Sequence, residues 1–179
     1  KIRKIFILGE STDNKVAYGL MKGEYDNAVL NKDTVNMIYA LNGLGLFGEE
    51  ENESGFNTSI TAINLARDAG LEYEYGFLLN NLGVSKLEMG EPKEAIKDFR
   101  KGLEIAKRVE SPRLELIVMQ NFGYYYMEVD SFELAKVKFI ESYERALSIN
   151  HYQVAVGSIV NLGGVYRQQK DYEKSGKPI

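Results

Sequence analysis

The stretch NNLGVSKLEMGEPKEAIKDF, residues 80–99, occurs in this chain more than once. It returns in altered form as QNFGYYYMEVDSFELAKVKF at residues 120–139, and it begins again as VNLGGVYRQQKDYEKS at residues 160–175. Successive copies are forty residues apart. A fixed period in this range is typical of a solenoid, in which one supersecondary unit is repeated and stacked on its neighbours.

Each copy predicts two antiparallel helices joined by a tight turn. In the first copy we expect a helix over residues 71–89 that ends at Gly90, because glycine adopts the left-handed conformation of a helix end without a Cβ penalty. Pro92 then falls in the first turn of the second helix, where its missing N–H costs nothing. Ser111 and Pro112 predict the same kind of helix start in the next copy.

Small residues predict where the two helices of a pair approach each other. Gly83 in the first helix and Ala95 in the second allow a close crossing, because one backbone has no side chain and the other has only a methyl group. Phe99 shares a helical face with Ala95, so we expect it to fill the wider space beside the crossing. The same three positions recur one period later as Gly123, Ala135 and Phe139.

This pattern resembles the tetratricopeptide repeat. That family has a small residue in the first helix, then a Tyr, a turn Gly, an aromatic residue, an Ala and a second aromatic residue. The matching residues are Gly83, Gly90, Ala95 and Phe99, then Gly123, Tyr126, Phe132, Ala135 and Phe139, and then Gly163, Tyr166 and Tyr172. The chain departs from the pattern at Lys86, Asp130, Lys170 and Ser175. The match covers residues 71–175 well and the first seventy residues weakly.

The period and the resemblance together predict an all-α fold, a right-handed superhelical solenoid of antiparallel helix pairs. We expect a single array over residues 1–179, made of a degenerate repeat at 1–32, a divergent repeat at 33–70, repeats at 71–110 and 111–150, and a truncated repeat at 151–179. Because solenoids need polar caps, we expect the array to continue beyond Ile179. We also expect that end to fray or to self-associate through its exposed apolar surface.

The start of the chain carries a weaker form of the pattern. Residues 1–9, KIRKIFILG, suit a buried strand or the end of a buried helix, and we favour the helix. Residues 11–13 offer caps for a short helix that ends at Gly23. Tyr25 and Ala28 then stand three apart, like the aromatic residue and the Ala that begin a second helix.

Caps and turn residues predict the remaining helices. Asp33 predicts a helix over residues 34–47. An acidic loop over residues 49–53 separates it from a second helix over about residues 57–69, which Gly70 closes. The last helices are expected over residues 132–149 and from His151 to about Gln169.

Composition excludes several classes of protein. Hydrophobic residues make up 44% of the 179 residues, which is enough for a continuous core, and the absence of cysteine excludes disulfides and thiolate metal sites. The net charge is −4 with both signs interspersed, which argues against a nucleic-acid-binding face. No run is long enough for a transmembrane helix, and no signal peptide is visible. We therefore expect a cytoplasmic protein.

Short motifs that could indicate chemistry have simpler explanations. Gly43, Gly45 and Gly48 spell GxGxxG, but three Glu residues follow and would repel a pyrophosphate. Alignment of LNGLGL with LNNLGV thirty-eight residues later makes Gly45 a packing glycine. His151 is the only histidine and lacks the spacing of a metal or catalytic site. The acidic run lacks the pattern of a calcium loop. We therefore predict no enzyme activity, no cofactor and no metal site.

Asn81, Asn121 and Asn161 recur at one position of three successive copies. Asparagine is unfavourable within a helix, so either it bonds to a neighbouring helix or it forms a row in a concave groove, where each amide matches the N–H and C=O of an extended peptide. In the tetratricopeptide family, Asn at this position commonly grips a bound peptide. The predicted peptide-binding residues are Asn80, Asn81, Glu88, Gln120, Asn121, Tyr124, Glu128, Asn161, Arg167 and Gln168.

The sequence thus favours a non-enzymatic peptide- or protein-binding module, the sensor or scaffold part of a larger regulatory protein. Its partner would be an extended peptide or protein segment with apolar and basic side chains, because apolar residues accompany Glu88 and Glu128 in the predicted groove. The family's carboxylate clamp, which binds acidic C-terminal tails, needs several Lys and Arg residues in the groove. Arg167 is the only basic residue predicted there. The alternative is a structural solenoid that packs against other domains of its own chain, as in ATP-dependent or DNA-binding regulators. We expect no direct contact with nucleic acid or membrane.

Overall fold

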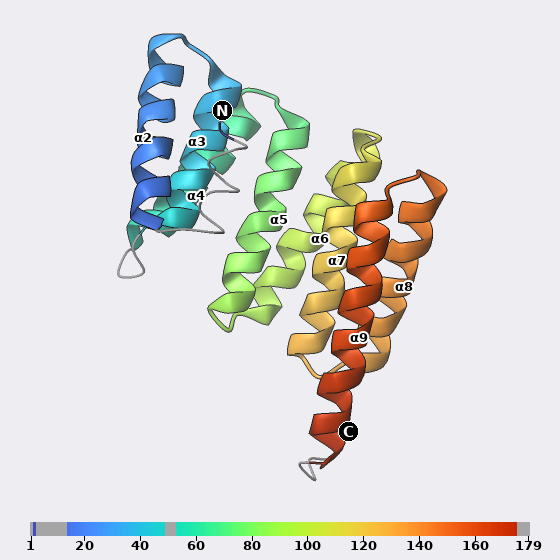
Figure 1. Ribbon diagram of the computed structural model, residues 1–179. Helices are drawn as coiled ribbons and strands as arrows, with labels where there is room; N and C mark the ends of the chain where they lie inside the picture. Colours follow the sequence, from blue (N-terminus) through green and yellow to red (C-terminus); the bar gives the residue numbers. More distant parts are fainter. Residues whose placement is uncertain (1, 3–13, 49–52, 175–179) are drawn as a thin grey trace. The chain divides into compact units, whose positions relative to one another are not determined.

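The computed structural model describes residue 2, residues 14–48 and residues 53–174, with side chains from 55 to 170 in the last segment. Apart from turns, these residues are helical, which confirms the all-α prediction (Figure 1). The helices are α2 (Asn14–Leu30), α3 (Thr34–Phe47), α4 (Glu53–Asp68), α5 (Glu72–Glu88), α6 (Pro92–Arg108), α7 (Pro112–Glu128), α8 (Phe132–Ser148) and α9 (Tyr152–Lys174).

The chain divides into two compact units, Lys1–Leu78 and Leu79–Ile179, and the division falls within α5. In the first unit α3 packs against both α2 and α4. In the second unit α7 packs between α6 and α8, and α8 packs on α9. We call α3, α5, α7 and α9 the A helices and α2, α4, α6 and α8 the B helices. Within the second unit the A helices run in one direction and the B helices in the opposite direction (Figure 1).

Caps confirm several predicted helix limits. Asp33 accepts the backbone N–H of Asn36 at 3.0 Å and begins α3 at the expected residue. Ser111 accepts the N–H of Leu114 at 3.3 Å at the start of α7. Each bond satisfies a backbone donor that has no partner within the helix.

Residues with positive φ mark the turns between helices. Lys32, Gly70, Glu110 and Asn150 follow the B helices, with φ of 54°, 67°, 49° and 57°, and Gly90 and Asp130 follow α5 and α7, with φ of 77° and 55°. At Glu110 the next residue, Ser111, donates its N–H to the carbonyl oxygen of Ala106 at 2.9 Å. This six-residue loop is the Schellman motif of a helix end. The repeat is therefore visible in the turns even where the sequence copies diverge.

The structure corrects the expected helix end at Gly23. α2 continues through this exposed residue, and a Cβ added there would meet nothing within 4 Å. Ala17, Met21 and Ala28 are buried along α2, and their burial outweighs the roughly 1 kcal/mol that a glycine costs inside a helix. The expected second helix beginning near Tyr25 is wrong for the same reason, because Tyr25 and Ala28 lie in the later half of α2.

Turn residues align α2 with the other B helices. Met21 lies eleven residues before Lys32, as Phe139 lies eleven residues before Asn150. Met21 thus takes the position of the second aromatic residue of the repeat. Gly43 in α3 leaves room for it, since a Cβ added at Gly43 would lie 2.7 Å from the Met21 sulfur.

Two other limits differ from the sequence predictions. α4 begins at Glu53 rather than near Asn57. α9 continues through Lys170, where a turn was expected, to Lys174. The corresponding turn residues of the earlier copies, Gly90 and Asp130, belong to types that adopt the left-handed conformation readily, whereas Gln and Lys at residues 168–170 are good helix formers. The predictions for residues 3–9, 11–13, 49–52 and 175–179 lie outside the described residues.

Within each pair of the second unit, an aromatic ring lies directly over a glycine. A Cβ added at Gly83 would stand 2.6 Å from the Phe99 ring, and one added at Gly123 would stand 2.5 Å from the Phe139 ring. Both rings are fully buried. The predicted crossing of helices at these glycines is therefore present, but the Phe ring, rather than the Ala methyl group, occupies the space that the glycine leaves. Ala95 approaches Gly83 through its carbonyl oxygen, which would lie 3.2 Å from a Cβ added at Gly83.

The first prediction tests this contact. We expect Gly123→Leu to lower the free energy of unfolding by at least about 1–3 kcal/mol, because the new side chain must displace the Phe139 ring from a packed core. Gly163→Leu is the matched control, since Gly163 has the same place in α9 and a Cβ there would meet nothing within 4 Å. Denaturant unfolding measures both variants. An equal effect of the two substitutions would show that the glycine–ring contact is not the constraint.

A second prediction separates backbone conformation from packing. Gly90 has open space around an added Cβ but a φ of 77°, so we expect Gly90→Ala to cost about 1–2 kcal/mol, the cost of a left-handed L-residue. Gly164 lies inside α9 with equally open space, and Gly164→Ala should gain up to about 1 kcal/mol from helix propensity. Thermal unfolding gives the sign of each change. If both substitutions shifted the melting temperature in the same direction, the explanation by backbone conformation would be wrong.

Candidate binding site

A pocket of about 400 Å³ lies on the A-helix side of the second unit, between α5 and α7. Its lining residues are Val84, Leu87 and Glu88 from α5, Phe99 from α6, and Asn121, Tyr124 and Glu128 from α7. Four predicted site residues therefore come together here: Glu88, Asn121, Tyr124 and Glu128. Phe99 also lines this pocket and was not among the predicted site residues. The sequence pattern placed it beside the crossing of the two helices, which gives no sign that it reaches the pocket.

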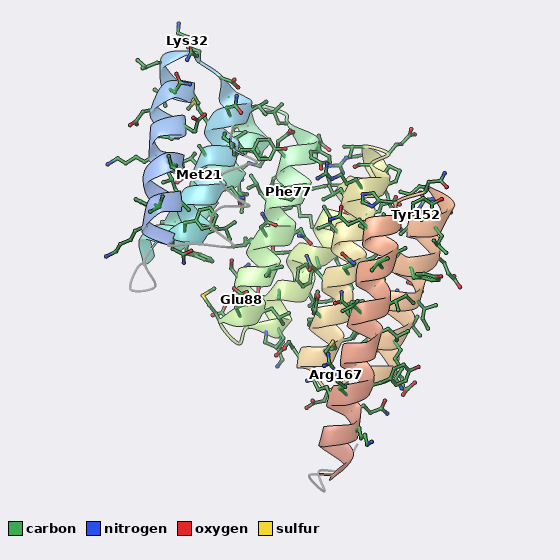
Figure 2. The ribbon with its side chains drawn as sticks, viewed as in Figure 1. Met21, Lys32, Phe77, Glu88, Tyr152 and Arg167 are labelled. Carbon is green, nitrogen blue, oxygen red and sulfur yellow. The ribbon has the colours of Figure 1, made fainter. Side chains whose placement is uncertain are left out.

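The repeat explains how these side chains reach one pocket. α5 and α7 are parallel A helices of successive pairs, so residues forty apart lie at equivalent positions on each. Glu88 and Glu128 are such a pair, and each is the last residue of its helix. Figure 2 shows Glu88 at the end of α5 that leads into the turn to α6.

Asn121 is held in the pocket by a buried partner. Its Nδ2 donates a hydrogen bond of 2.8 Å to Oδ1 of Asn80, which is only 1% exposed. Asn80 in turn donates through its own Nδ2 to Oδ1 of Asn81 at 3.4 Å. Asn80 was predicted as a groove residue, but its burial leaves it to support Asn121 rather than to meet a ligand.

The recurring asparagines all bond to other side chains. Asn81 and Asn121 both bond to Asn80, and Asn161 accepts the hydroxyl hydrogen of Tyr124 at 2.9 Å. The structural reading of the row is thus present in the geometry. An Asn amide has two donor hydrogens and two acceptor positions. The bond to Asn80 uses one donor hydrogen of Asn121, so it orients the side chain without using its full hydrogen-bonding capacity.

Gln120 belongs to a buried chain of hydroxyl groups. Its Nε2 donates to Oγ of Ser158 at 3.3 Å, and that oxygen lies 3.0 Å from both the Ser142 hydroxyl oxygen and the Val154 carbonyl oxygen. Ser142 and Ser158 are fully buried. Gln120 therefore ties α7 to α9 rather than lining the pocket.

Arg167 and Gln168 are exposed on α9, outside the lining of the pocket. Figure 2 shows Arg167 in the part of α9 that leads toward its C-terminal end. The structure does not bring these two residues together with the other predicted site residues.

The charges that line the pocket are both negative. The nearest basic residue in the last turn of α5 is Lys86, whose Nζ lies 2.7 Å from Asp98. Both side chains of this pair are largely buried, at 18% and 15% exposed. Lys86 stands where the repeat pattern has a Tyr, and the bond across the turn to Asp98 explains how it is accommodated there. The last turn of α7 contains no basic residue.

The glycine-rich motif near residue 45 has a packing role. Gly43 and Gly45 lie inside α3, and Gly48 is its C-cap. An added Cβ at Gly45 would meet the Ser59 side chain and lie 2.9 Å from the Gly55 carbonyl oxygen. A dinucleotide site needs such a motif between a strand and the start of a helix, whereas here it lies inside a helix and at its end.

Two features are absent from the described residues. None of their helices is both long and apolar enough to cross a membrane. Among the same residues, no three His, Cys, Asp or Glu side chains are grouped so that they could hold a metal ion.

One helix pair matches a known family, and the fold is similar to that of solved structures. Residues 78–113 match the tetratricopeptide repeat family. The crystal structure of BtubC (BKLC) from P. vanneervenii superposes with a TM-score of 0.67 at 19% identity, covering 96% of this chain and 72% of that one. A signal transduction ATPase with numerous domains (STAND) and a tetratricopeptide repeat sensor, from Pyrococcus horikoshii, superposes with a TM-score of 0.62 at 16% identity. That alignment covers 97% of this chain and 32% of the ATPase, so this chain spans about a third of its length.

No curated protein matches the chain by sequence. The structural likenesses at this identity establish the fold, and the match at residues 78–113 identifies the helix pair that the fold repeats. Residues 78–113 thus carry the tetratricopeptide repeat pattern, and the chain shares its helical fold with the two superposed structures.

Proposed function

We propose that this chain is a non-enzymatic binding module for an extended peptide or protein segment, and that it forms the sensor or scaffold part of a larger regulatory protein. The observation that carries the proposal is the pocket between α5 and α7, into which Asn121 and the exposed Tyr124 project. Asn80 holds the Asn121 amide in place, so the amide is ready to bond to a peptide backbone.

Two further observations support this role. The similar ATPase from Pyrococcus horikoshii is described as having a tetratricopeptide repeat sensor. For the present chain, we infer a sensor role from the likeness of fold. The spacing also suits an extended chain, because packed helices lie roughly 8–10 Å apart and an extended peptide advances about 3.3 Å per residue. Asparagines on successive A helices could then meet backbone groups about three residues apart. We propose a cytoplasmic array, with a partner of apolar and basic side chains and no direct contact with nucleic acid.

A third prediction tests the binding role of Asn121. We expect Asn121→Ala to weaken binding of a peptide selected from a display library by about 1–3 kcal/mol, through lost and unpaired hydrogen bonds. Asn80→Ala is the matched variant, because it removes the same bond between helices but no group that lines the pocket. Both variants should lose about 1 kcal/mol of stability. Calorimetry measures affinity, and thermal unfolding measures stability.

The comparison of the two variants decides the role of the asparagine row. A large loss of affinity for Asn121→Ala, with a much smaller loss for Asn80→Ala, supports a direct contact with the peptide. Equal stability losses with unchanged affinity in both would make the row purely structural. If display selection yields no peptide that binds to the pocket beside Tyr124, the binding proposal is wrong.

The second candidate is a structural array that packs against other domains of its own chain or against a second copy. One observation favours it. Tyr152, Val156 and Val160 of α9 are 63%, 65% and 63% exposed and lie on one face of the helix. Figure 2 shows Tyr152 at the start of α9. Exposed apolar patches of this kind mark interaction surfaces.

A fourth prediction tests this candidate. We expect Val156→Glu to reduce concentration-dependent association, because the new charge would have to be buried in the interface. Val137→Glu on α8 is the control, since Val137 is also exposed but does not belong to this patch. Analytical ultracentrifugation measures association. A wild type that stays monomeric at high concentration would rule out self-association through α9.

A further inference from the structure

We propose that the pocket between α5 and α7 binds one cationic side chain, Lys or Arg, of an extended peptide. The stem of that side chain would lie against the apolar wall, and its charge would lie between Glu88 and Glu128. This inference rests on the proposed function and names the residue that the site selects.

The two carboxylates stand at helix ends that favour cations. Glu88 and Glu128 are the last residues of α5 and α7, and the C-terminal end of a helix carries a partial negative charge of about half an elementary charge. Cations stabilise a helix at this end, and anions destabilise it. Two parallel helices therefore each carry an acidic residue where helix stability favours a basic one, and both carboxylates line the same pocket.

The nearby cation, Lys86, is already neutralised. Lys86, in the last turn of α5, is paired with Asp98 at 2.7 Å, and both side chains are largely buried. The side chains that line the pocket carry two negative charges and no positive one. A cation from a partner would thus complete the local charge balance, whereas an acidic side chain would be repelled.

The walls of the pocket suit the stem of a Lys or Arg side chain. The pocket has a volume of about 400 Å³, and its apolar lining residues are Val84, Leu87 and Phe99. Lys and Arg bury their methylene stems along apolar surface while the charged head stays near water. The exposed ring of Tyr124 forms another wall, and an aromatic face attracts a cation. The exposed carboxylates at the helix ends then take the charged head.

The test uses synthetic peptide arrays and the complete chain. Two arrays carry the same random nonapeptides, except that the central residue is Arg in one and its neutral analogue citrulline in the other. We expect binding to the Arg array and its loss on the citrulline array. The strongest Arg peptide and its citrulline twin are then titrated against the wild type, Glu88→Gln and Glu128→Gln. Glu144→Gln, an exposed residue of α8 outside the pocket, is the control.

We expect each pocket variant to weaken the Arg peptide by about fivefold, as a partly exposed ion pair does, and to leave the citrulline peptide unchanged. The same variants should keep or raise the melting temperature, because each removes a carboxylate from a helix C-terminus. A general loss of folding would lower it. Glu144→Gln should leave both affinities unchanged.

The outcomes separate this inference from the proposed function. Equal binding of the Arg and citrulline peptides, or unchanged affinity in both pocket variants, overturns the cationic pocket while peptide binding stands. Absence of binding to either array, together with failure of the display selection, overturns the proposed function and this inference with it.

Discussion

The second unit depends on the contact between bare backbone and an aromatic ring. Gly83 and Gly123 have no side chain, and the rings of Phe99 and Phe139 occupy the space that a side chain would take. Each A helix can therefore lie close to its B helix, and the buried rings gain the transfer energy of large apolar groups. Phe99 also lines the pocket, and its ring centroid lies 5.9 Å from that of Phe122 on the next A helix, with the two rings tilted by 55°. Phe99 thus takes part in its own helix pair, in the contact with the neighbouring pair and in the pocket.

Polar bonds between A helices then set how these pairs align. Asn80 is buried, and a buried amide costs free energy unless it finds a partner. Its bond to Asn121 meets that cost and fixes α7 against α5. The bond from Tyr124 to Asn161 does the same between α7 and α9. These bonds are structural in themselves, and they also hold Asn121 and Tyr124 where a partner could meet them.

Local signals predicted most helices, because caps and turns act within a few residues. Asp33, Gly90 and Pro92 gave limits that the structure confirms within a residue or so. The limits at Lys170 and Gly23 were wrong for different reasons. α9 continues past Lys170 because residues 168–170 are good helix formers. α2 continues past Gly23 because residues of its buried face, such as Met21, pack along it. Met21 against Gly43 illustrates this, since neither residue indicates the other in the sequence.

The sequence by itself determined the helix pair, its period, and the fact that Glu88, Asn121, Tyr124 and Glu128 share the A-helix side. It could do so because a residue's position on a helix follows from its number within the repeat. Only the tertiary structure decided that Asn80 is buried beneath Asn121, that Gln120 bonds to Ser158, and that Asp98 neutralises Lys86. These outcomes depend on the distance between neighbouring helices, which the side chains packed between them set and which a repeat period does not contain.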